Sequence, residues 1–433
     1  MRYQFSLMLY RLFFLCVLPV IWLLLLLRSI KQTAYRQRLS ERFGLLPREL
    51  KSGGIIVHAA SVGEVIALKS FITQLLETKP KTVITVTTFT PTGSEQVSKL
   101  FGDRVQHCYL PLDSTFCIAA FLNKLKPKAM VFMETELWPN LIAQSRDHGI
   151  KLLLINGRLS QKSMNSYSKI AWLITPTINS FDKVLCQSQV NYDNFLALGA
   201  DASRCQISGN VKFDISVNQA VKDKQQELAR FVEDERLIWV VASTHKGDEK
   251  IALNAFALLL KNVPQLLLII VPRHPERFNE VAELCHDRGY SITRRSTQEK
   301  VTSDKKIWLL DTLGELLPIC ALASVVTMGG SFSAIGGHNP LEPALFKKPI
   351  VVGPNMSNFA EVMQQLIAEK GIVQLEDKGD SDDRNICDEL FHEINAILMS
   401  EETQQALGES AHRVVTENQG ASQRTLKQLL KLI

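Results

Sequence analysis

Short apolar runs alternate with amphipathic stretches along the first half of the chain. The runs cover residues 55–60, 82–88, 107–112, 129–134, 151–157 and 183–188. After the first two runs, apolar residues recur with helical spacing at about 64–77 and 91–100. Strands that alternate with helices at this pace predict right-handed βαβ units around a parallel sheet.

The alternation stops in a polar segment and then restarts. Residues 209–226, GNVKFDISVNQAVKDKQQ, lack apolar periodicity, which is typical of a linker. The second series of strand-like runs lies at 237–244, 266–274, 290–295, 306–311, 323–330 and 349–354, and each except the third precedes a predicted helix. We therefore expect an α/β protein with two doubly wound, Rossmann-like domains that face a central cleft. The expected boundaries are an anchor at 1–30, a first domain at 31–211, a linker at 212–235 and a second domain at 236–433.

The N-terminal segment is apolar from residue 5 to residue 27, with Tyr10 and Arg11 as interruptions. As a helix it would extend roughly 35 Å, which is enough to cross a bilayer. An interfacial helix that enters one leaflet is the alternative, because Arg11 and Pro19 shorten the uninterrupted core. No small-residue cleavage site follows, so we expect the segment to stay with the protein. Because lipid-solvated residues add little to the cores, we also expect the two domains to fold when residues 1–28 are deleted.

Basic residues follow the apolar segment and form the densest positive cluster of the chain. They are Arg28, Lys31, Arg36, Arg38 and Arg42. By the positive-inside rule, they predict that both domains lie at the cytoplasmic face of a membrane. Arg36, Arg38 and Arg42 either determine this topology only or also attract phosphates and anionic headgroups.

Composition limits the possible partners. The 433 residues, 46% of them hydrophobic, allow two substantial cores. The formal charge of +5 is small for this length, and basic residues are spread along the chain, so we expect no nucleic-acid partner. The eight cysteines include no C-x-x-C pair and no Cys/His cluster at metal-ligand spacing. We expect them to be reduced core residues, and we expect no metal and no resident cofactor.

One strand-like run leads directly into a turn that ends in a carboxylate. In IIVHAASVGE, residues 55–64, small residues precede Glu64 and would place it at the carboxyl edge of the sheet, where a general base is useful. The alternative is that Glu64 only opens the next helix, where acidic side chains are favourable. A second acidic strand end, VFMETELWPN at 131–140, lies in the same half, and the two loops together indicate a shared crevice.

The second half contains a glycine-rich loop, MGGSFSAIGGHNPLEPA at 328–344. Its glycines would let a phosphate approach the backbone, and a helix that starts near Asn339, with Pro340 in its first turn, would offer free N–H groups. Glu342 would then accept hydrogen bonds from ribose hydroxyls. A tight turn without a ligand is the alternative.

Two further strand ends would converge on this loop in a parallel sheet. VPRHPERF at 271–278 offers Arg273, and DTLGEL at 311–316 offers a turn at Gly314. Arg273 would pair with a phosphate or carboxylate, or it is an ordinary surface arginine. STHKGDE at 243–249 borders the same edge, and we expect its Ser and Thr residues to cap a helix.

The motifs HAASVGE, METELWPN, GNVKFD, PRHPERF and GGHNPLEPA occur in this order across both halves. In this respect the chain resembles the 3-deoxy-D-manno-octulosonic acid (Kdo) transferases of Gram-negative bacteria, from the apolar segment to about residue 417. The resemblance implies a GT-B glycosyltransferase fold, CMP-Kdo as donor and a lipid A precursor (lipid IVA) as acceptor. It also implies an N-terminal membrane anchor, action at the cytoplasmic face of the inner membrane, and no metal.

The resemblance also assigns residues. It implies that Glu64 is the general base of an inverting transfer and that Glu134 and Lys212 stabilise the transition state. The implied CMP-binding residues are Pro272, Arg273, Leu313, Gly314, Glu315, Asn339, Pro340, Leu341 and Glu342. From the chemistry, we expect Lys212 to swing on the linker toward the leaving phosphate, and Glu134 either to raise the pKa of Glu64 or to orient the acceptor. Ala60 and Pro343 depart from the family pattern without removing a functional group.

Two other functions fit the same architecture. One is a different two-domain sugar-nucleotide enzyme, such as a UDP-sugar transferase or a 2-epimerase. The other is a membrane-tethered nucleotide-binding scaffold without turnover, although a scaffold has no use for a base at Glu64. Turnover of CMP-Kdo with release of CMP discriminates among the three.

Overall fold

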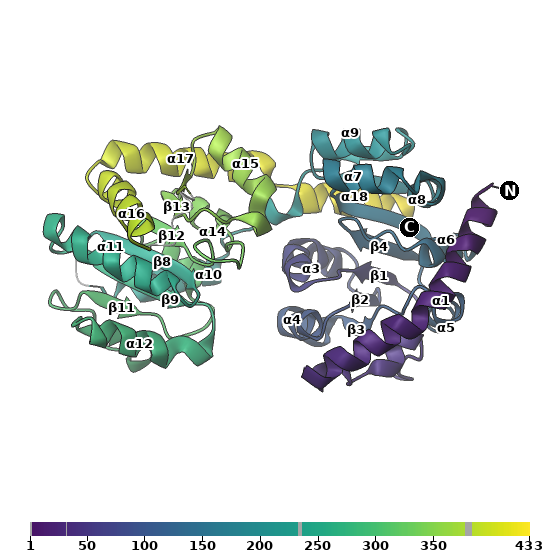
Figure 1. Ribbon diagram of the computed structural model, residues 1–433, viewed down its shortest axis with the longest axis horizontal. Helices are drawn as coiled ribbons and strands as arrows, with labels where there is room; N and C mark the ends of the chain where they lie inside the picture. The colour runs from purple at the N-terminus through teal and green to yellow at the C-terminus, as the bar shows by residue number, and fades with distance from the viewer. Residues whose placement is uncertain (1, 32, 233–235, 377–382) are drawn as a thin grey trace. The chain divides into compact units, whose positions relative to one another are not determined.

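A computed structural model describes residues 2–31, 33–232, 236–376 and 383–433 of the chain (Figure 1). The chain forms two compact units. Unit 1 consists of Met1–Asp214 and Asn418–Ile433, and unit 2 of Ile215–Glu417. Each unit has its own parallel sheet with helices on both faces, as the alternation of apolar runs predicts.

The sheet of unit 1 has seven strands in the order β3-β2-β1-β4-β5-β6-β7, and every pair is parallel. The strands are β1 (Ile55–His58), β2 (Ile84–Thr88), β3 (Gln106–Tyr109), β4 (Ala129–Met133), β5 (Lys151–Gly157), β6 (Lys183–Cys186) and β7 (Cys205–Ile207). Alternate strand residues enter different cores, so that Val57 faces one helical layer and Ile56 the other.

The helices of unit 1 connect these strands. They are α1 (Arg2–Lys31), α2 (Val62–Ala67), α3 (Lys69–Thr78), α4 (Pro91–Phe101), α5 (Thr115–Leu125), α6 (Pro139–Asp147), α7 (Gln161–Ser168), α8 (Ala171–Ile178), α9 (Gln189–Ala197) and α18 (Ala421–Leu432). Short 3-10 turns lie at η1 (Thr33–Tyr35), η2 (Leu39–Phe43), η3 (Gly102–Arg104) and η4 (Val211–Phe213). The helix predicted at 64–77 is interrupted at Leu68, which separates α2 from α3.

The sheet of unit 2 also has seven strands, in the order β10-β11-β9-β8-β12-β13-β14, and is parallel throughout. The strands are β8 (Ile238–Thr244), β9 (Leu267–Pro272), β10 (Ile292–Arg294), β11 (Ile307–Leu309), β12 (Val325–Met328), β13 (Ile350–Val352) and β14 (Val373–Gln374). The helices are α10 (Gln219–Ala229), α11 (Asp248–Asn262), α12 (Phe278–Asp287), α13 (Leu316–Cys320), α14 (Leu341–Ala344), α15 (Ala360–Ala368), α16 (Asp383–Leu398) and α17 (Glu401–Asn418).

The predicted strands are confirmed in both units, and the strands that the prediction omitted are β7 and β14. Both are edge strands. In β7 only Cys205 is buried, while Gln206 and Ile207 are exposed, and both residues of β14 are half-buried. Neither has the continuous apolar run that identified the central strands.

The predicted linker at 212–235 is corrected by the structure. Its first residues form η4 within unit 1, and α10 packs on α13 of unit 2. Lys224 lies 3.3 Å from Glu315, and Glu227 lies 2.7 Å from Arg295, so α10 is tied to unit 2 by ion pairs. The residues 233–235 of this segment are outside the described part of the chain.

The predicted second domain at 236–433 is also corrected, because its last helix belongs to unit 1. In Figure 1, α18 (yellow) lies among the elements of unit 1. Leu426 and Leu429 join the buried cluster that contains Val57. Asp214 accepts hydrogen bonds from the backbone N–H groups of Gly420 and Ser422, which fixes the start of α18.

This arrangement predicts which unit depends on α18. Leu429→Ala removes a fully buried side chain, so it should lower the free energy of unfolding of unit 1 by about 2–5 kcal/mol. Hydrogen exchange read by mass spectrometry will report the two units separately. Leu390→Ala, at an equally buried site in unit 2, is the matched control. Faster exchange of unit 2 in the Leu429 variant would contradict the assignment of α18.

The N-terminal apolar segment forms α1, and its expected independence from the globular part is wrong. Leu7 and Phe14 are buried, and α1 packs on α6, α8 and η1. Within the described residues, one helix, Tyr3–Ile30, is long and apolar enough to cross a membrane, with a mean hydropathy of 2.5. Removing residues 1–28 would therefore uncover apolar surface on unit 1.

Candidate functional site

Glu64 lies just beyond the carboxyl end of β1, in the first turn of α2. The Ser61 hydroxyl accepts a hydrogen bond from the Glu64 N–H, so Ser61 caps the helix. The Glu64 carboxylate in turn accepts bonds from the Ser61 hydroxyl at 2.7 Å and from the Ala60 N–H at 2.9 Å. This resembles a capping box with the Ala60 N–H in place of the Ser61 N–H, and Glu64 therefore opens the helix while it faces the edge of the sheet.

The surroundings of Glu64 favour its protonated form. Burial raises the pKa of Glu64 most, and the negative charges of Glu134 and Glu136 raise it further. The hydrogen bonds from Ser61 and Ala60 oppose these effects in part. A carboxylate with a raised pKa is a stronger proton acceptor once it is ionised, which suits a general base.

Glu134 directly follows β4 and has a strained backbone. Its φ is 57°, in the left-handed region that non-glycine residues rarely adopt. Its N–H donates to Ile155 O at 2.9 Å, which continues the pairing of β4 with β5. Asn156, at the corresponding place on β5, has a φ of 51°. Strain of this kind at adjacent strand ends is a common feature of functional sites.

Lys212 reaches Glu134, with its Nζ atom 3.5 Å from Glu134 Oε1. It belongs to η4, where Asn210 Oδ1 accepts its N–H at 3.0 Å. Val211 and Phe213 on either side are buried, and the Val211 N–H donates to the buried Asn156 side chain. The expectation that Lys212 swings on a linker is therefore wrong, because η4 is anchored in unit 1.

Glu136 is a further acidic residue that the sequence analysis did not single out. Its Oε2 atom accepts from Trp138 Nε1 at 2.7 Å and lies 3.4 Å from Nε2 of the buried His58. Burial alone would raise the pKa of Glu136, but the His58 and Trp138 contacts outweigh burial and lower it. The negative charge of Glu136 then contributes to the raised pKa of Glu64.

The basic residues after α1 divide into two kinds. Arg42 is buried, donates to Phe89 O at 2.7 Å and lies over the Tyr109 ring. Arg38 pairs with Glu41 at 2.7 Å and donates to His107 O. Both guanidinium groups therefore have several structural partners. Arg36 is exposed and donates to Ser29 Oγ at 3.1 Å, and it is the remaining candidate for headgroups among the three.

The glycine-rich loop of unit 2 follows β12 and is held by a buried carboxylate. Asp248 Oδ2 accepts from the N–H groups of Gly330 at 2.6 Å and His245 at 2.8 Å. Burial raises the pKa of Asp248 to about 6. Gly329 lies so close to β8 that a Cβ atom would meet Ser243 O at 2.7 Å, so bare backbone is required there.

The helix expected near Asn339 is present but short. It is α14, four residues long, and Pro340 is its N-cap. Asn339 Oδ1 accepts from the Leu341 N–H at 3.1 Å, which uses one of the N–H groups proposed for a phosphate. A single helical turn carries little dipole, so the helix-end argument for phosphate binding is corrected: any anion here would need side-chain cations.

Several ionisable side chains lie near α14. Burial raises the pKa of the half-buried Glu342 to about 7, and Arg273 counteracts part of this rise. His245 and His338 stack with their Nε2 atoms 2.8 Å apart. Burial, the neighbouring histidine and Arg273 lower the pKa of His338 to about 4. The exposed Arg273 follows Pro272 at the end of β9 and is a cation in this group.

The turn at 313–315 follows β11, and its one charged side chain, Glu315, already has partners within unit 2. Gly314 has a φ of 85°, and Leu313 is 60% exposed. Glu315 is buried and bound by Arg295 at 3.1 Å and by Lys224 at 3.3 Å. Its carboxylate is therefore engaged within unit 2, and the backbone of the turn is the part that remains available to a ligand.

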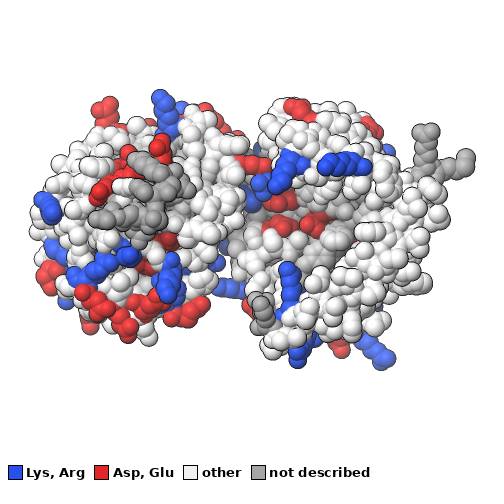
Figure 2. Space-filling model, in the orientation of Figure 1, with Lys and Arg blue, Asp and Glu red and all other residues white. Residues whose placement is uncertain are grey.

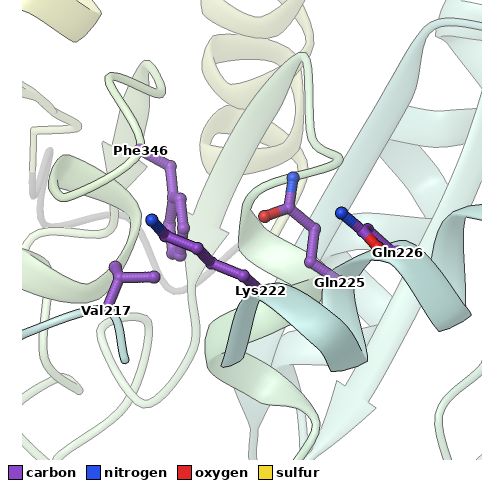
Figure 3. A pocket seen from close by; sticks show the side chains of 5 residues that line it. All are labelled: Val217, Lys222, Gln225, Gln226 and Phe346. Carbon is purple, nitrogen blue, oxygen red and sulfur yellow. The ribbon is translucent and has the colours of Figure 1, made fainter. Parts of the chain in front are cut away.

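A pocket of about 380 Å³ lies elsewhere on unit 2 (Figure 3). Side chains of α10 and of the segment after α14 form its wall. They are Val217, Lys222, Gln225, Gln226 and Phe346. None of the predicted site residues lines this pocket, and the Lys222 ammonium is the single charged group in its wall. The chemistry of the strand ends is therefore the stronger guide to the site.

Comparison with known proteins identifies the family. The model of the family described as 3-Deoxy-D-manno-octulosonic-acid transferase (kdotransferase) matches residues 37–215. The 3-deoxy-D-manno-octulosonic acid transferase of Haemophilus influenzae is 39% identical over 94% of this chain and 94% of its own length. The chain belongs to the Kdo transferase family. It is therefore a glycosyltransferase, as the ordered motifs predicted.

Other known proteins are similar to this Kdo transferase family member in sequence or in fold. The Rickettsia typhi 3-deoxy-D-manno-octulosonic acid transferase is 31% identical over 86% of this chain and 78% of its own. UDP-GlcNAc 2-epimerase from Neisseria meningitidis has a TM-score of 0.56 at 15% identity, over 88% of this chain and 100% of that one. A glycosyltransferase from Rickettsia africae has a TM-score of 0.53 at 13% identity, over 88% and 97%. These structures confirm the predicted two-domain GT-B type of fold.

The predicted site residues therefore form a group in each unit. In unit 1, Glu64, Glu134 and Lys212 lie together at the carboxyl ends of β1 and β4. In unit 2, Arg273 and Asn339 both lie close enough to Glu342 to lower its pKa. The 313–315 turn follows β11, which is next to β9 in the sheet. In the described residues, no group of three or more His, Cys, Asp or Glu side chains is arranged to hold a metal.

Proposed function

We propose that this protein transfers Kdo from CMP-Kdo to a lipid A precursor, lipid IVA, in lipopolysaccharide inner-core biosynthesis. The observation that carries the proposal is the cluster of Glu64, Glu134 and Lys212 at the strand ends of unit 1. Membership of the Kdo transferase family supports the choice of the transferred sugar.

The reaction is a single displacement with inversion at the anomeric carbon. Glu64 takes the proton from the acceptor hydroxyl, whose oxygen bonds to the anomeric carbon of Kdo while the bond to the CMP phosphate breaks. CMP leaves with the electron pair of the broken bond, and the proton of the acceptor hydroxyl ends on Glu64. Lys212 supplies positive charge beside the reacting centre, and Glu134 fixes the position of its ammonium group at 3.5 Å.

Unit 2 binds the nucleotide in this proposal. Arg273 pairs with the phosphate, because it is an exposed cation at the end of β9. Glu342 accepts hydrogen bonds from the ribose hydroxyls. The proposed CMP-binding set is completed by Pro272, the turn at 313–315 and the residues 339–341. The donor contacts at 313–315 come from backbone, since Glu315 is already bound to Arg295.

The acceptor is a membrane lipid, so we also propose that the protein works at the cytoplasmic face of the bacterial inner membrane. The apolar helix α1, with basic residues after it, supports this location. Confinement to the leaflet that contains the acceptor reduces the search for it to two dimensions.

One experiment tests the reaction as a whole. The purified protein is incubated with CMP-Kdo and detergent-dispersed lipid IVA, and the lipid product is analysed by mass spectrometry and its anomeric configuration by NMR. We expect addition of Kdo, release of CMP and inversion. CMP binding without turnover would instead indicate a scaffold, and transfer from a UDP-sugar with none from CMP-Kdo would indicate another sugar-nucleotide enzyme.

Activity should survive an excess of EDTA. In the proposed scheme Lys212 and Arg273 provide the positive charge that a divalent cation provides in many phosphoryl-leaving reactions. The measurement is the transfer rate before and after chelation, with addition of Mg²⁺ as the control. Loss of activity that Mg²⁺ restores would contradict this part of the scheme.

The pH profile should depend on Glu134. Glu64 must be ionised to act as the base, so kcat/KM falls as the pH drops through the raised pKa of Glu64. Glu134→Gln removes one of the negative charges that raise this pKa, so the acidic limb of kcat/KM should move to lower pH. An unmoved limb in the Gln variant would mean that Glu134 orients the acceptor and does not tune Glu64.

A further inference from the structure

The apolar helix α1 is less exposed on one face, which contacts unit 1 most closely in its amino-terminal half, where Ser6, Leu7 and Phe14 are buried. The covered positions recur every three or four residues, which is the spacing of one face of a helix. They are Tyr3, Ser6, Leu7, Tyr10, Arg11, Phe14, Val17, Leu18, Ile21, Leu25, Leu26 and Ser29, all buried or half-buried. In Figure 1, α1 (purple) runs along the side of unit 1 past α6 and α5.

Hydrogen bonds hold the amino-terminal half of α1 on this surface. The Ser6 hydroxyl donates to Trp172 O at 3.1 Å, and the Tyr10 hydroxyl donates to the buried Asp113 at 2.8 Å. Arg11 donates to the buried Asn140 at 2.7 Å. The polar residues that interrupt the apolar segment are therefore the ones that attach it to the globular part.

The carboxyl-terminal end of α1 is attached as well. Ser29 is buried, and its hydroxyl accepts a hydrogen bond from Arg36 at 3.1 Å. The turn η1 packs against this end of the helix. The carboxyl-terminal end of α1 is thus held by the residues that directly follow it, roughly 35 Å from the Ser6 contact along the helix axis.

The opposite face of α1 is apolar and exposed. Its large apolar side chains are Phe5, Met8, Leu9, Leu12, Phe13, Leu15, Val20, Trp22, Leu23, Leu24, Leu27 and Ile30. Two other exposed apolar residues belong to the contacts of the helix: Phe116, 81% exposed, is three residues after Asp113, which binds Tyr10, and Trp172 accepts the Ser6 hydrogen bond with its backbone carbonyl. In Figure 2 the surface along α1, at the right, carries few charged side chains.

We propose that α1 does not span the bilayer but lies in the plane of one leaflet, with its exposed face and Phe116 and Trp172 inserted among the lipids. A spanning helix is surrounded by lipid over a hydrocarbon core of about 30 Å. Because α6 and α8 contact α1 and bind it at Ser6 and Arg11, spanning would carry these two helices and their polar groups into hydrocarbon, which is strongly unfavourable.

Lipid is the occupant that fits this surface best. The helix has a mean hydropathy of 2.5 and contains no acidic residue, and Arg28 and Arg36 are exposed at its carboxyl-terminal end. Anionic headgroups attract such cations, whereas a second copy of the chain would bring the same positive charges. An apolar face of this extent is typical of membrane contact.

A depth measurement on the full chain tests the proposal. Cys16 is the exposed cysteine of α1, and the other seven cysteines are buried, so the native protein accepts a fluorescent label at Cys16. In a Cys16→Ser background, Leu9→Cys, Leu23→Cys and Ile30→Cys place labels on the same exposed face at heptad spacing. Quenching by lipids with shallow or deep spin labels then gives each depth in phosphatidylethanolamine–phosphatidylglycerol vesicles.

Labels at the four positions should lie at one shallow depth, about 5–10 Å below the headgroups. Deep labels at Cys16 and Leu23 with shallow ones at Leu9 and Ile30 would show a spanning helix and overturn the proposal. Quenching of all positions by aqueous iodide would show a water-exposed helix. Protection from both kinds of quencher in a dimer would show a second copy as the occupant, and either result also overturns it.

A pair of matched variants tests the participation of unit 1. Phe116→Glu puts a charge into the proposed membrane face, and its binding to the same vesicles should fall about tenfold or more. Val190→Glu makes a comparable change at a 69% exposed apolar residue of α9, and it should bind as the native chain does. Equal binding of both would remove Phe116 from the membrane face. Transfer to detergent-dispersed acceptor, measured in parallel, reports separately on the proposed function.

Discussion

Replacing Glu64 by glutamine is expected to lower kcat by about two to four orders of magnitude, the usual contribution of a general base. Glutamine keeps the shape of the side chain and can still accept a bond from Ser61 or Ala60, so α2 should remain capped. What is lost is the ability to take a proton from the acceptor hydroxyl. Binding of CMP-Kdo belongs to unit 2 in the proposed scheme and should be nearly unchanged.

Three measurements on the same variant separate chemistry from misfolding. Transfer to lipid IVA gives kcat, calorimetric titration with CMP gives donor binding, and thermal unfolding gives stability. Glu77→Gln is the matched control, because it removes an exposed carboxylate from the neighbouring helix α3. Near-native transfer by the Glu64 variant would exclude Glu64 as the base, and loss of CMP binding together with a lower melting temperature would indicate damage to the fold.

The central strands could be predicted because their sequence and their environment agree. Ile55, Ile56 and Val57 are all buried, so β1 reads as a continuous apolar run, and β4 and β9 do the same. The return of α18 could not be predicted in this way. Its amphipathic pattern identifies a helix but does not show which core Leu429 enters. That depends on contacts with distant residues, such as the hydrogen bond from the Gly420 N–H to Asp214, about two hundred residues earlier in the chain.

The candidate site was predicted in part for a similar reason. Glu64 and Glu134 follow apolar strands, so their place at the sheet edge could be read from the sequence. The role of Glu136 depends on His58, a buried residue of β1 whose ring faces it across the sheet edge. Lys212 lies in a polar segment that resembles a linker, and the buried Val211 and Phe213 beside it are too few to indicate a fixed turn.

The length of the helix after the glycine-rich loop could not be predicted, because the glycines before it permit several backbone conformations. Gly337 has a φ of 76°, and its N–H donates to Gly330 O at 2.9 Å, so the loop closes on itself. A Cβ atom at Gly337 would also clash with the Met356 sulfur. The chain therefore turns tightly up to Asn339, and a single helical turn, α14, follows.

Lys212→Met is expected to lower transfer by about two to three orders of magnitude, the usual effect of removing one preorganised charge or donor from a transition state. Methionine keeps most of the apolar stem of lysine and removes the ammonium group. The surrounding turn should persist, since Asn210 and Asn156 hold its backbone N–H groups and do not contact the lysine side chain. Lys69→Met, at an exposed position of α3, is the matched control.

A double-mutant cycle with Glu134→Gln identifies what the Lys212 charge acts on. Lys212 Nζ lies 3.5 Å from Glu134 Oε1, so a purely structural lysine would serve to neutralise that carboxylate. In that case Glu134→Gln should restore most of the activity that Lys212→Met loses. If the ammonium group instead stabilises the departing phosphate, the double variant should be at least as slow as Lys212→Met alone. We expect the second result, because the Lys212 side chain is 22% exposed beside Glu134, so its ammonium group can contact a ligand as well as Glu134.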